Sequence, residues 1–269
     1  CEGLVGSEMC IRDRNMYYLI EIPWEYPFLV LLGFVVSIIN TMAGGASIIT
    51  LPILIFLGLP SNVANGTNRI GLMMTAFSAN MGFKSKGIST FPFSAYTGMF
   101  ALIGSVIGAH IAVEINDETF NRILSIIMIL VITIIIFKPR IINKNLSVRL
   151  TGKHLKISCI VFFFIGLYGG FINAGIGFVI MLFLHYYNRL NLIRVNATKV
   201  VIVLVYTIGA FLTFFFNGLV DLPYGLCLGL GTLIGGWNAS RFSVEKGEGV
   251  IKIFLVISAL IIAFKLWFF

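Results

Sequence analysis

Ten apolar stretches with almost no charged residues follow residue 26, and they constrain the fold more than any other feature of the chain. Their approximate limits are 26–43, 46–58, 68–83, 93–113, 120–137, 157–174, 178–187, 199–216, 222–238 and 250–269. Most contain the 17–25 residues that a helix needs to cross about 30 Å of hydrocarbon. The chain is 58% hydrophobic and only 11% charged, whereas soluble domains carry about 25% charged residues. We therefore predict an all-α, polytopic integral membrane protein, which excludes a soluble enzyme and a disordered chain.

The positive charges lie in short loops between these stretches. The net charge of +8 would by itself suggest a nucleic-acid partner. However, six Lys and Arg residues lie within 138–156, most of the others follow on the same predicted side, and acidic residues occupy the alternate loops. We predict that the protein lies in the cell (inner) membrane. By the positive-inside rule, 138–156 is then a cytoplasmic linker and the N-terminus lies outside. No nucleic-acid partner is expected.

Residues 1–15 differ from the rest of the chain. Cys1–Arg14 is polar, and its VGSEMCIRDR segment resembles the translated read-through of a sequencing adaptor. The segment lacks the basic start and apolar run of a signal peptide. We therefore expect 1–15 to be non-native and the native chain to start at Met16. The rest divides into a first transmembrane repeat at 16–137, the linker at 138–156 and a second transmembrane repeat at 157–269.

The two halves of the chain are related by a constant offset. A shift of 131 positions aligns 65–67 (Asn-Gly-Thr) with 196–198 (Asn-Ala-Thr), and Pro92 with Pro223. Across 65–114 this shift gives 12 identities in 50 positions without a gap. Because Asn, Pro and Gly match as well as apolar residues, we interpret the chain as a duplication.

Loops at equivalent positions of the two halves have different charge. The segment 84–86 (Lys-Ser-Lys) aligns with 215–217 (Phe-Phe-Asn). Each half therefore makes an odd number of crossings, and we predict two inverted-topology repeats of about five hydrophobic segments each. There are five crossings per half if the short stretches 46–58 and 178–187 span the membrane. There are three if the first two stretches of each half form a re-entrant hairpin, and the charge pattern fits both.

Each short stretch follows a glycine-rich break, at 43–46 (Ala-Gly-Gly-Ala) and 175–177 (Gly-Ile-Gly). Short, Gly-interrupted segments at corresponding positions of two repeats are typical of secondary transporters, whose solute binds near the midplane at the repeat interface. We expect broken helices that restart at Ser47 and Phe178. Their free N–H groups favour a negatively charged solute.

The polar motifs of both halves resemble a known family. In the first half they are Gly33, Asn40, Gly44, Gly45 and Pro52, followed by Asn65-Gly66-Thr67-Asn68-Arg69. This pattern resembles the TauE/SafE (sulfite exporter) family, and 196–199 (Asn-Ala-Thr-Lys) is similar to that family's second repeat motif. The resemblance runs from about residue 28 to the end. It implies a multi-spanning permease for small anions, either sulfur-containing ones such as sulfite, sulfoacetate and thiosulfate, or other organic anions.

The candidate solute-binding residues lie at the two breaks and at the two Asn-x-Thr segments. They are Asn40, Gly44, Gly45, Asn65, Thr67, Arg69, Asn173, Gly177, Asn196, Thr198 and Lys199. Each also has a plainer interpretation. Arg69 is either an anion ligand or a side chain that reaches the lipid headgroups, and Lys199 is either its partner or an ordinary orientation charge.

The Asn and Thr candidates have plainer interpretations too. Asn40 and Asn173 bind solute, satisfy backbone groups freed by the breaks, or do both. Thr67 and Thr198, with the Asn residues before them, are otherwise helix caps. Three Gly-x-x-x-Gly patterns, which begin at Gly104, Gly166 and Gly231, predict close helix packing, within one chain or between chains.

Three other classes of function compete with a transporter. No H-E-x-x-H pair, no G-x-S-x-G elbow and no carboxylate pair lies within the apolar stretches, so we predict neither an enzyme nor a cofactor or metal. A passive anion channel is the main alternative, and a non-transporting assembly subunit is a weaker one. The expected partners are a small anionic solute and the lipid bilayer. A coupling proton or sodium ion and a homo-oligomer are left open by the sequence.

Overall fold

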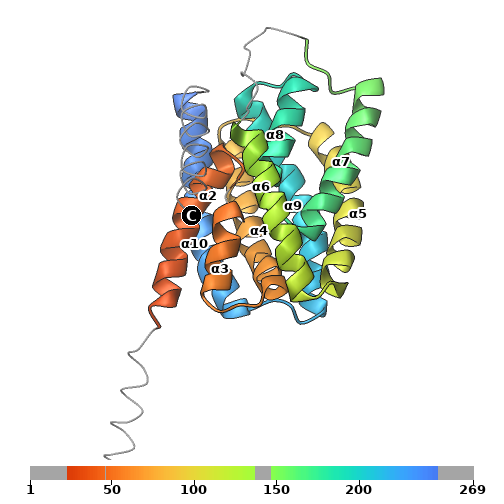
Figure 1. Ribbon diagram of the computed structural model, residues 1–269. Helices are drawn as coiled ribbons and strands as arrows, with labels where there is room; N and C mark the ends of the chain where they lie inside the picture. The colour runs from red at the N-terminus through yellow and green to blue at the C-terminus, as the bar shows by residue number, and fades with distance from the viewer. Residues whose placement is uncertain (1–22, 46, 137–146, 248–269) are drawn as a thin grey trace, which may run out of the picture.

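The computed structural model describes residues 23–45, 47–136 and 147–247, and all regular secondary structure in these ranges is α-helical (Figure 1). The helices are α2 (Glu25–Met42), α3 (Ser47–Phe56), α4 (Ser61–Ser85), α5 (Phe93–Glu114), α6 (Asp117–Ile136), α7 (Lys153–Phe171), α8 (Ile176–Tyr186), α9 (Leu192–Phe216) and α10 (Leu222–Lys246). Helices α2, α5, α7 and α9 are long and apolar enough to cross a membrane. The all-α prediction and the prediction of transmembrane helices are confirmed. The predictions for 1–15, for 138–146 of the linker and for the last apolar stretch lie outside the described residues.

Each of the two short helices turns back beside the helix before it. Leu29 of α2 and Leu54 of α3 share one buried apolar cluster. In the second half, Nδ2 of Asn188, just after α8, donates to the Arg149 carbonyl (2.8 Å) and to Ser158 Oγ (3.0 Å), on either side of the start of α7. The pairs α2–α3 and α7–α8 are therefore helical hairpins. Figure 1 shows that α2 and α7 begin at opposite ends of the molecule.

A glycine with a left-handed backbone lies at the tip of each hairpin. Gly44 has φ +87° and Gly175 has φ +71°, a conformation that other residues adopt only at a cost in energy. Helix α3 begins at Ser47, the expected residue, whereas α8 begins at Ile176 rather than at Phe178. The difference arises because Gly175 itself is the N-cap of α8. Gly44 and Gly175 are 131 positions apart in the sequence.

Glycines let helices from opposite halves pack closely. A Cβ added to Gly104 of α5 would lie 2.0 Å from the Phe163 carbonyl of α7, and one added to Gly231 of α10 would lie 1.9 Å from the Val30 carbonyl of α2. No side chain fits at these distances. The Gly-x-x-x-Gly patterns therefore serve close packing within the chain, with α5 against α7 and α2 against α10.

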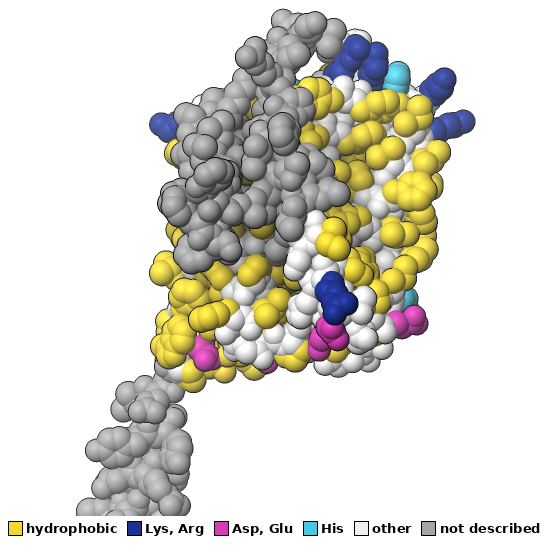
Figure 2. All heavy atoms as spheres, viewed as in Figure 1, with side chains coloured by type: hydrophobic (Ala, Val, Ile, Leu, Met, Phe, Trp, Pro, Cys, Tyr) yellow, Lys and Arg dark blue, Asp and Glu magenta, His cyan; other side chains and the backbone are white. Residues whose placement is uncertain are grey.

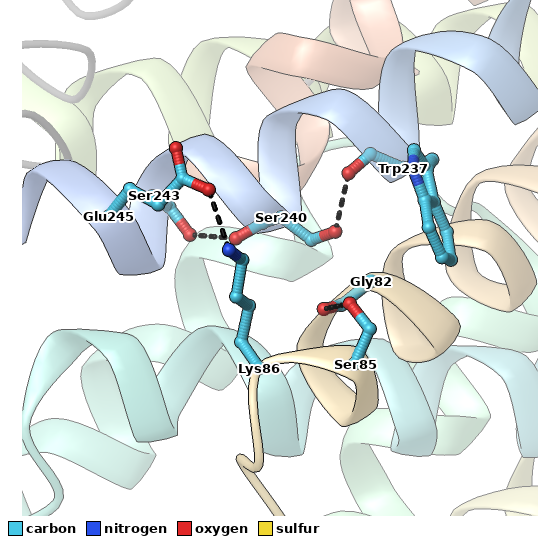
Figure 3. Close-up of polar contacts among 7 residues, drawn as sticks. All are labelled: Gly82, Ser85, Lys86, Trp237, Ser240, Ser243 and Glu245. Atoms are coloured by element: carbon cyan, nitrogen blue, oxygen red, sulfur yellow. Dashed lines mark hydrogen bonds and ion pairs between the residues drawn. The ribbon is translucent and has the colours of Figure 1, made fainter.

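An apolar band separates two charged ends of the molecule. On the face that Figure 2 shows, most Lys and Arg side chains gather at one end and Asp and Glu at the other, where a basic side chain lies beside them. Large apolar side chains face outward on the band, and Phe164 and Phe216 are 63% and 80% exposed. At the basic end, Lys86 after α4 pairs with Glu245 of α10, with 2.7 Å between Nζ and Oε1 (Figure 3). The exposed band is the surface expected of a protein that is embedded in lipid.

Candidate functional site

The tips of the two hairpins meet inside the molecule. A Cβ added to Gly177 would lie 2.0 Å from the Gly44 carbonyl oxygen, and one added to Gly44 would lie 2.6 Å from the Gly177 carbonyl carbon. Gly45 is equally confined, because an added Cβ would lie 1.9 Å from the Phe178 ring. Three predicted glycines thus act by letting backbone and ring approach closely, rather than by contributing a side chain.

Two small cavities lie beside this contact. The first, which we call the Lys199 cavity, has a volume of about 10 Å³ and is lined by Asn40, Gly44, Ser47, Leu72, Thr75, Ala76, Asn173, Ile176, Gly177, Lys199, Val200, Val203 and Tyr206. The second, the Asn68 cavity, also has about 10 Å³ and is lined by Val36, Ser37, Asn40, Ser47, Thr50, Asn68, Gly71, Leu72, Thr75, Leu228 and Thr232. They share Asn40, Ser47, Leu72 and Thr75. Each has room for about one water molecule.

Lys199 holds the end of the opposite hairpin's first helix. Its side chain extends from α9, and the residue is 2% exposed. Nζ donates to the carbonyls of Asn40 (2.9 Å) and Thr41 (3.0 Å) and to Asn196 Oδ1 (2.9 Å). A lysine ammonium has three donors, so all three are used. A cation at the C-terminal end of α2 also neutralises the negative end of the helix dipole. The interpretation of Lys199 as an ordinary orientation charge is therefore wrong.

Arg69 binds the C-terminal end of α7 as Lys199 binds that of α2, but Arg69 lines neither cavity. It is fully buried on α4, with Nη1 3.0 Å from the Gly169 carbonyl and Nη2 2.6 Å from the Gly170 carbonyl. Its guanidinium carbon lies 4.8 Å from the centre of the Phe214 ring. A side chain that reached the lipid headgroups would be exposed, so that interpretation of Arg69 is wrong. In the described part of the chain, Nε of Arg69 has no partner.

The two predicted Asn residues on α4 and α9 complete these helix ends. Asn65 donates to the Phe171 carbonyl (2.9 Å) and Asn196 to the Met42 carbonyl (3.3 Å). Three consecutive carbonyls at the end of α7, those of 169–171, and three at the end of α2, those of 40–42, thus bind side chains from the other half. Such carbonyls have no partner within their own helix.

Thr67 and Thr198 do not cap helix starts. Helices α4 and α9 begin at Ser61 and Leu192, so both Thr residues lie inside a helix. Thr67 Oγ1 accepts from the Asp221 backbone N–H (2.9 Å), and Thr198 Oγ1 donates to the Arg194 carbonyl (2.7 Å). The prediction of capping failed because the buried polar segments before each apolar stretch belong to the same helix.

Asn40 and Asn173 both line the Lys199 cavity, but their side-chain amides differ in hydrogen bonding. Asn173 Oδ1 accepts from the Tyr206 hydroxyl (2.7 Å), and its Nδ2 lies 3.4 Å from Ser47 Oγ. Asn40 lines both cavities, and among the described residues its side-chain amide makes no hydrogen bond. Of these two amides, that of Asn40 is therefore the one without a partner among the described residues.

Several residues of the site were missed from the sequence. Thr75 and Tyr206 are 131 positions apart and line the Lys199 cavity together. Asn68 lies between two predicted residues and aligns with Lys199 under the same shift. The 131-position offset could have indicated all three, but single polar residues inside an apolar helix give no stronger signal.

The chain can also be compared with known proteins. The sequence profile of the family described as sulfite exporter TauE/SafE matches residues 29–266. The chain belongs to the TauE/SafE family. Membership confirms the predicted resemblance and makes the chain a membrane-embedded permease, since TauE/SafE is a family of membrane transporters and not of enzymes.

Curated relatives of this TauE/SafE chain carry transporter names. The "Probable membrane transporter protein ORF9" of Sinorhizobium sp is 26% identical, over 89% of this chain and 91% of the relative. The "Probable membrane transporter protein" of Haemophilus influenzae is 26% identical, over 87% and 91%. The "Probable membrane transporter protein YfcA" of Escherichia coli K12 is 24% identical, over 85% and 84%. No solved structure matches the chain.

Proposed function

We propose that this TauE/SafE protein is a secondary transporter of small anions and that the solute binds in the Lys199 cavity. The charge balance of the cavity carries the proposal. Lys199 lines it, and so do Ser47 and Ile176, the first residues of α3 and α8. Among the described residues no Asp or Glu is buried. A cation and two positive helix ends without a carboxylate favour an anion.

The end of α2 offsets only part of the positive charge of a Lys199 ammonium. The C-terminal end of α2 carries roughly half a negative charge, so it neutralises only part of the unit charge of Lys199. A buried charge is screened far less than one in water. An anion in the Lys199 cavity would therefore compensate the residual positive charge, and a cationic or neutral solute would not.

Reciprocal contacts support two inverted repeats. Helices α4 and α9 have 25 residues each, and their first residues are 131 positions apart. Asn65 and Arg69 of the first half bind the end of α7, whereas Asn196 and Lys199 of the second half bind the end of α2. Each half thus anchors the hairpin of the other, as expected for a site at a repeat interface.

The hairpins support three crossings per half. Because α3 and α8 return to the ends from which α2 and α7 start, we infer that they are re-entrant. The basic end would then be cytoplasmic, with the N-terminal end of α2 outside the inner membrane. Cysteines introduced at Trp24 and Phe56, which are 66% and 88% exposed, should both react with an impermeant reagent added from the same side.

The size of the cavity favours a carrier over a passive channel. The Lys199 cavity has room for about one water molecule, which is less than sulfite, thiosulfate, sulfoacetate or any other organic anion needs. A solute must therefore separate the hairpin tips on entering, which is the motion that alternating access between two repeats requires. An open pore would need a continuous, wider path.

The test is uptake of labelled sulfite into proteoliposomes that hold the full chain, with thiosulfate, sulfoacetate and sulfate as competitors. We expect saturable uptake, suppression by at least one competitor, and acceleration by unlabelled sulfite on the opposite side. Proton and sodium gradients, imposed separately, identify a coupling ion. Flux that does not saturate and shows no counterflow would support a channel, and absence of flux for every anion would refute anion transport.

A further inference from the structure

We propose that Asn68 binds an uncharged hydrogen-bond acceptor on the transported anion, in the Asn68 cavity. The preferred solute is then a monoanion whose anionic group lies at Lys199 and whose second polar group is neutral. This inference rests on the proposed function and extends it from the charge of the solute to its shape and chemistry.

The amide of Asn68 has one group without a partner. The residue is 2% exposed, and Oδ1 accepts from Thr50 Oγ1 at 2.8 Å. Since Oδ1 accepts, the other side-chain atom is the amide nitrogen Nδ2. It is fully buried and, within the described residues, has no hydrogen-bond partner. Buried donors are rarely left unpaired in proteins, because they lose their bonds to water. The cavity that Asn68 lines is therefore suited to an acceptor.

Most hydroxyl groups that line the Asn68 cavity are already used as donors, and the amides of Asn68 and Asn40 and the Ser47 hydroxyl remain. Ser37, Thr75 and Thr232 each donate to a carbonyl of their own helix, at 2.8–2.9 Å. Thr50 donates to Asn68 itself. Their hydroxyl protons are therefore already used. The Asn40 amide, which both cavities share, is the other side-chain amide on the path from Lys199 to Asn68.

The residues that line the Asn68 cavity also determine which kind of second polar group on the solute can bind there. Among the described residues, no Lys, Arg, His, Asp or Glu lines the Asn68 cavity. A second negative charge would be buried there without a counter-charge, which is costly. A hydroxyl, ether or carbonyl oxygen would accept from Nδ2 at no such cost. The two cavities share four lining residues and are therefore neighbours, so a short solute that widens both would contact Lys199 and Asn68 together.

The test measures inhibition of labelled sulfite uptake in proteoliposomes by three competitors: ethanesulfonate, 2-hydroxyethanesulfonate and sulfoacetate. All three carry a sulfonate. Ethanesulfonate has no second acceptor, 2-hydroxyethanesulfonate has a neutral hydroxyl as its second acceptor, and sulfoacetate has a second negative charge. We expect the inhibition constant of 2-hydroxyethanesulfonate to be about threefold to tenfold lower than that of ethanesulfonate, the range of one neutral hydrogen bond. Sulfoacetate should inhibit less well than 2-hydroxyethanesulfonate.

The variant Asn68→Leu removes the donor while keeping the branched shape of the side chain, and it should bring the ratio of the first two inhibition constants to about one. Asn238→Leu, the same substitution on the outer surface of α10, should keep the wild-type ratio. If Asn68→Leu does not fold, Asn68→Ala serves instead, and the wild-type ratio is a test without any variant.

The outcomes separate this inference from the proposed function. Wild-type sulfite uptake that is saturable, with equal inhibition by both sulfonates, would refute the Asn68 site and leave anion transport intact. A variant that weakens both sulfonates by the same factor would show that Asn68 only supports the packing or binds a buried water. Absence of saturable uptake in the wild type would refute the proposed function itself.

Discussion

The two hairpin tips of this protein are anchored alike and used differently. The first helix of each hairpin ends in three carbonyls, and an Asn and a cation from the other half bind them. Yet Lys199 lines one of the two cavities described above, and Arg69 lines neither of them. Likewise, the Asn173 amide is held by Tyr206, whereas the Asn40 amide is free among the described residues. The shared contacts hold the two breaks together, and the differing ones lie where we propose that the solute binds.

The contact between the tips should be the most sensitive point of the comparison. Gly44→Ala forces a left-handed backbone on Ala and a clash with Gly177. Strain and overpacking together should destabilise the fold by about 3 kcal/mol. Gly58 also has a positive φ (+96°), but an added Cβ would meet nothing within 4 Å, so Gly58→Ala should cost only about 1 kcal/mol. Unfolding midpoints in detergent measure both, and equal losses would show that the contact contributes nothing.

Lys199→Met should have the largest effect on transport among folded variants. It removes the cation from the cavity and the charge-assisted hydrogen bonds to Asn40 and Thr41. A loss of about 3 kcal/mol corresponds to about a 100-fold lower kcat/KM for sulfite uptake. The KM should carry much of the change. Lys84→Met, at an exposed site on α4, is the control, and similar kinetics in both variants would argue against a solute at Lys199.

Arg69→Met should separate anchoring from binding. Arg69 lies outside both cavities, and its two carbonyl partners on α7 are backbone groups. Their loss should lower the thermal midpoint by about 5 °C, from a destabilisation of about 2 kcal/mol. The maximal uptake rate should fall about tenfold, with a smaller change in KM than Lys199→Met gives. Arg69→Lys should recover part of both. A KM effect as large as that of Lys199→Met would place Arg69 on the solute path after all.

The features that the sequence predicted are local or periodic. Apolar stretches gave the helices, glycine clusters gave the breaks, and the 131-position offset related the halves before any contact was known. The family followed from the motifs around Asn40, Asn65 and Asn196. These signals are readable because each depends on residues close together in the chain or on a constant spacing.

The contacts of the site could not be predicted, because their partners are far apart in sequence. Arg69 binds carbonyls about 100 positions away, and a carbonyl carries no sequence signal. The start of α4 was placed too late because Ser61–Asn68 is mostly polar, although nearly all of it is buried. Tyr206 was overlooked since an aromatic residue in an apolar helix usually serves packing, whereas here its hydroxyl holds Asn173.

The smallest expected difference in uptake kinetics lies between variants of the two matched residues, Asn40 and Asn173. It tests most sharply whether one tip binds the solute and the other supports the structure. Asn40→Ala removes the amide that both cavities share and should raise the KM for sulfite about fivefold, the range of one hydrogen bond. Asn173→Ala releases Tyr206 and Ser47 and should lower the maximal rate more than it raises KM. Tyr206→Phe should reproduce the pattern of Asn173→Ala, because it breaks the same bond from the other side. If both Asn variants instead raise KM alike, the two hairpin tips bind the solute equivalently. The difference between the Asn40 and Asn173 amides in this structure would then play no part in binding.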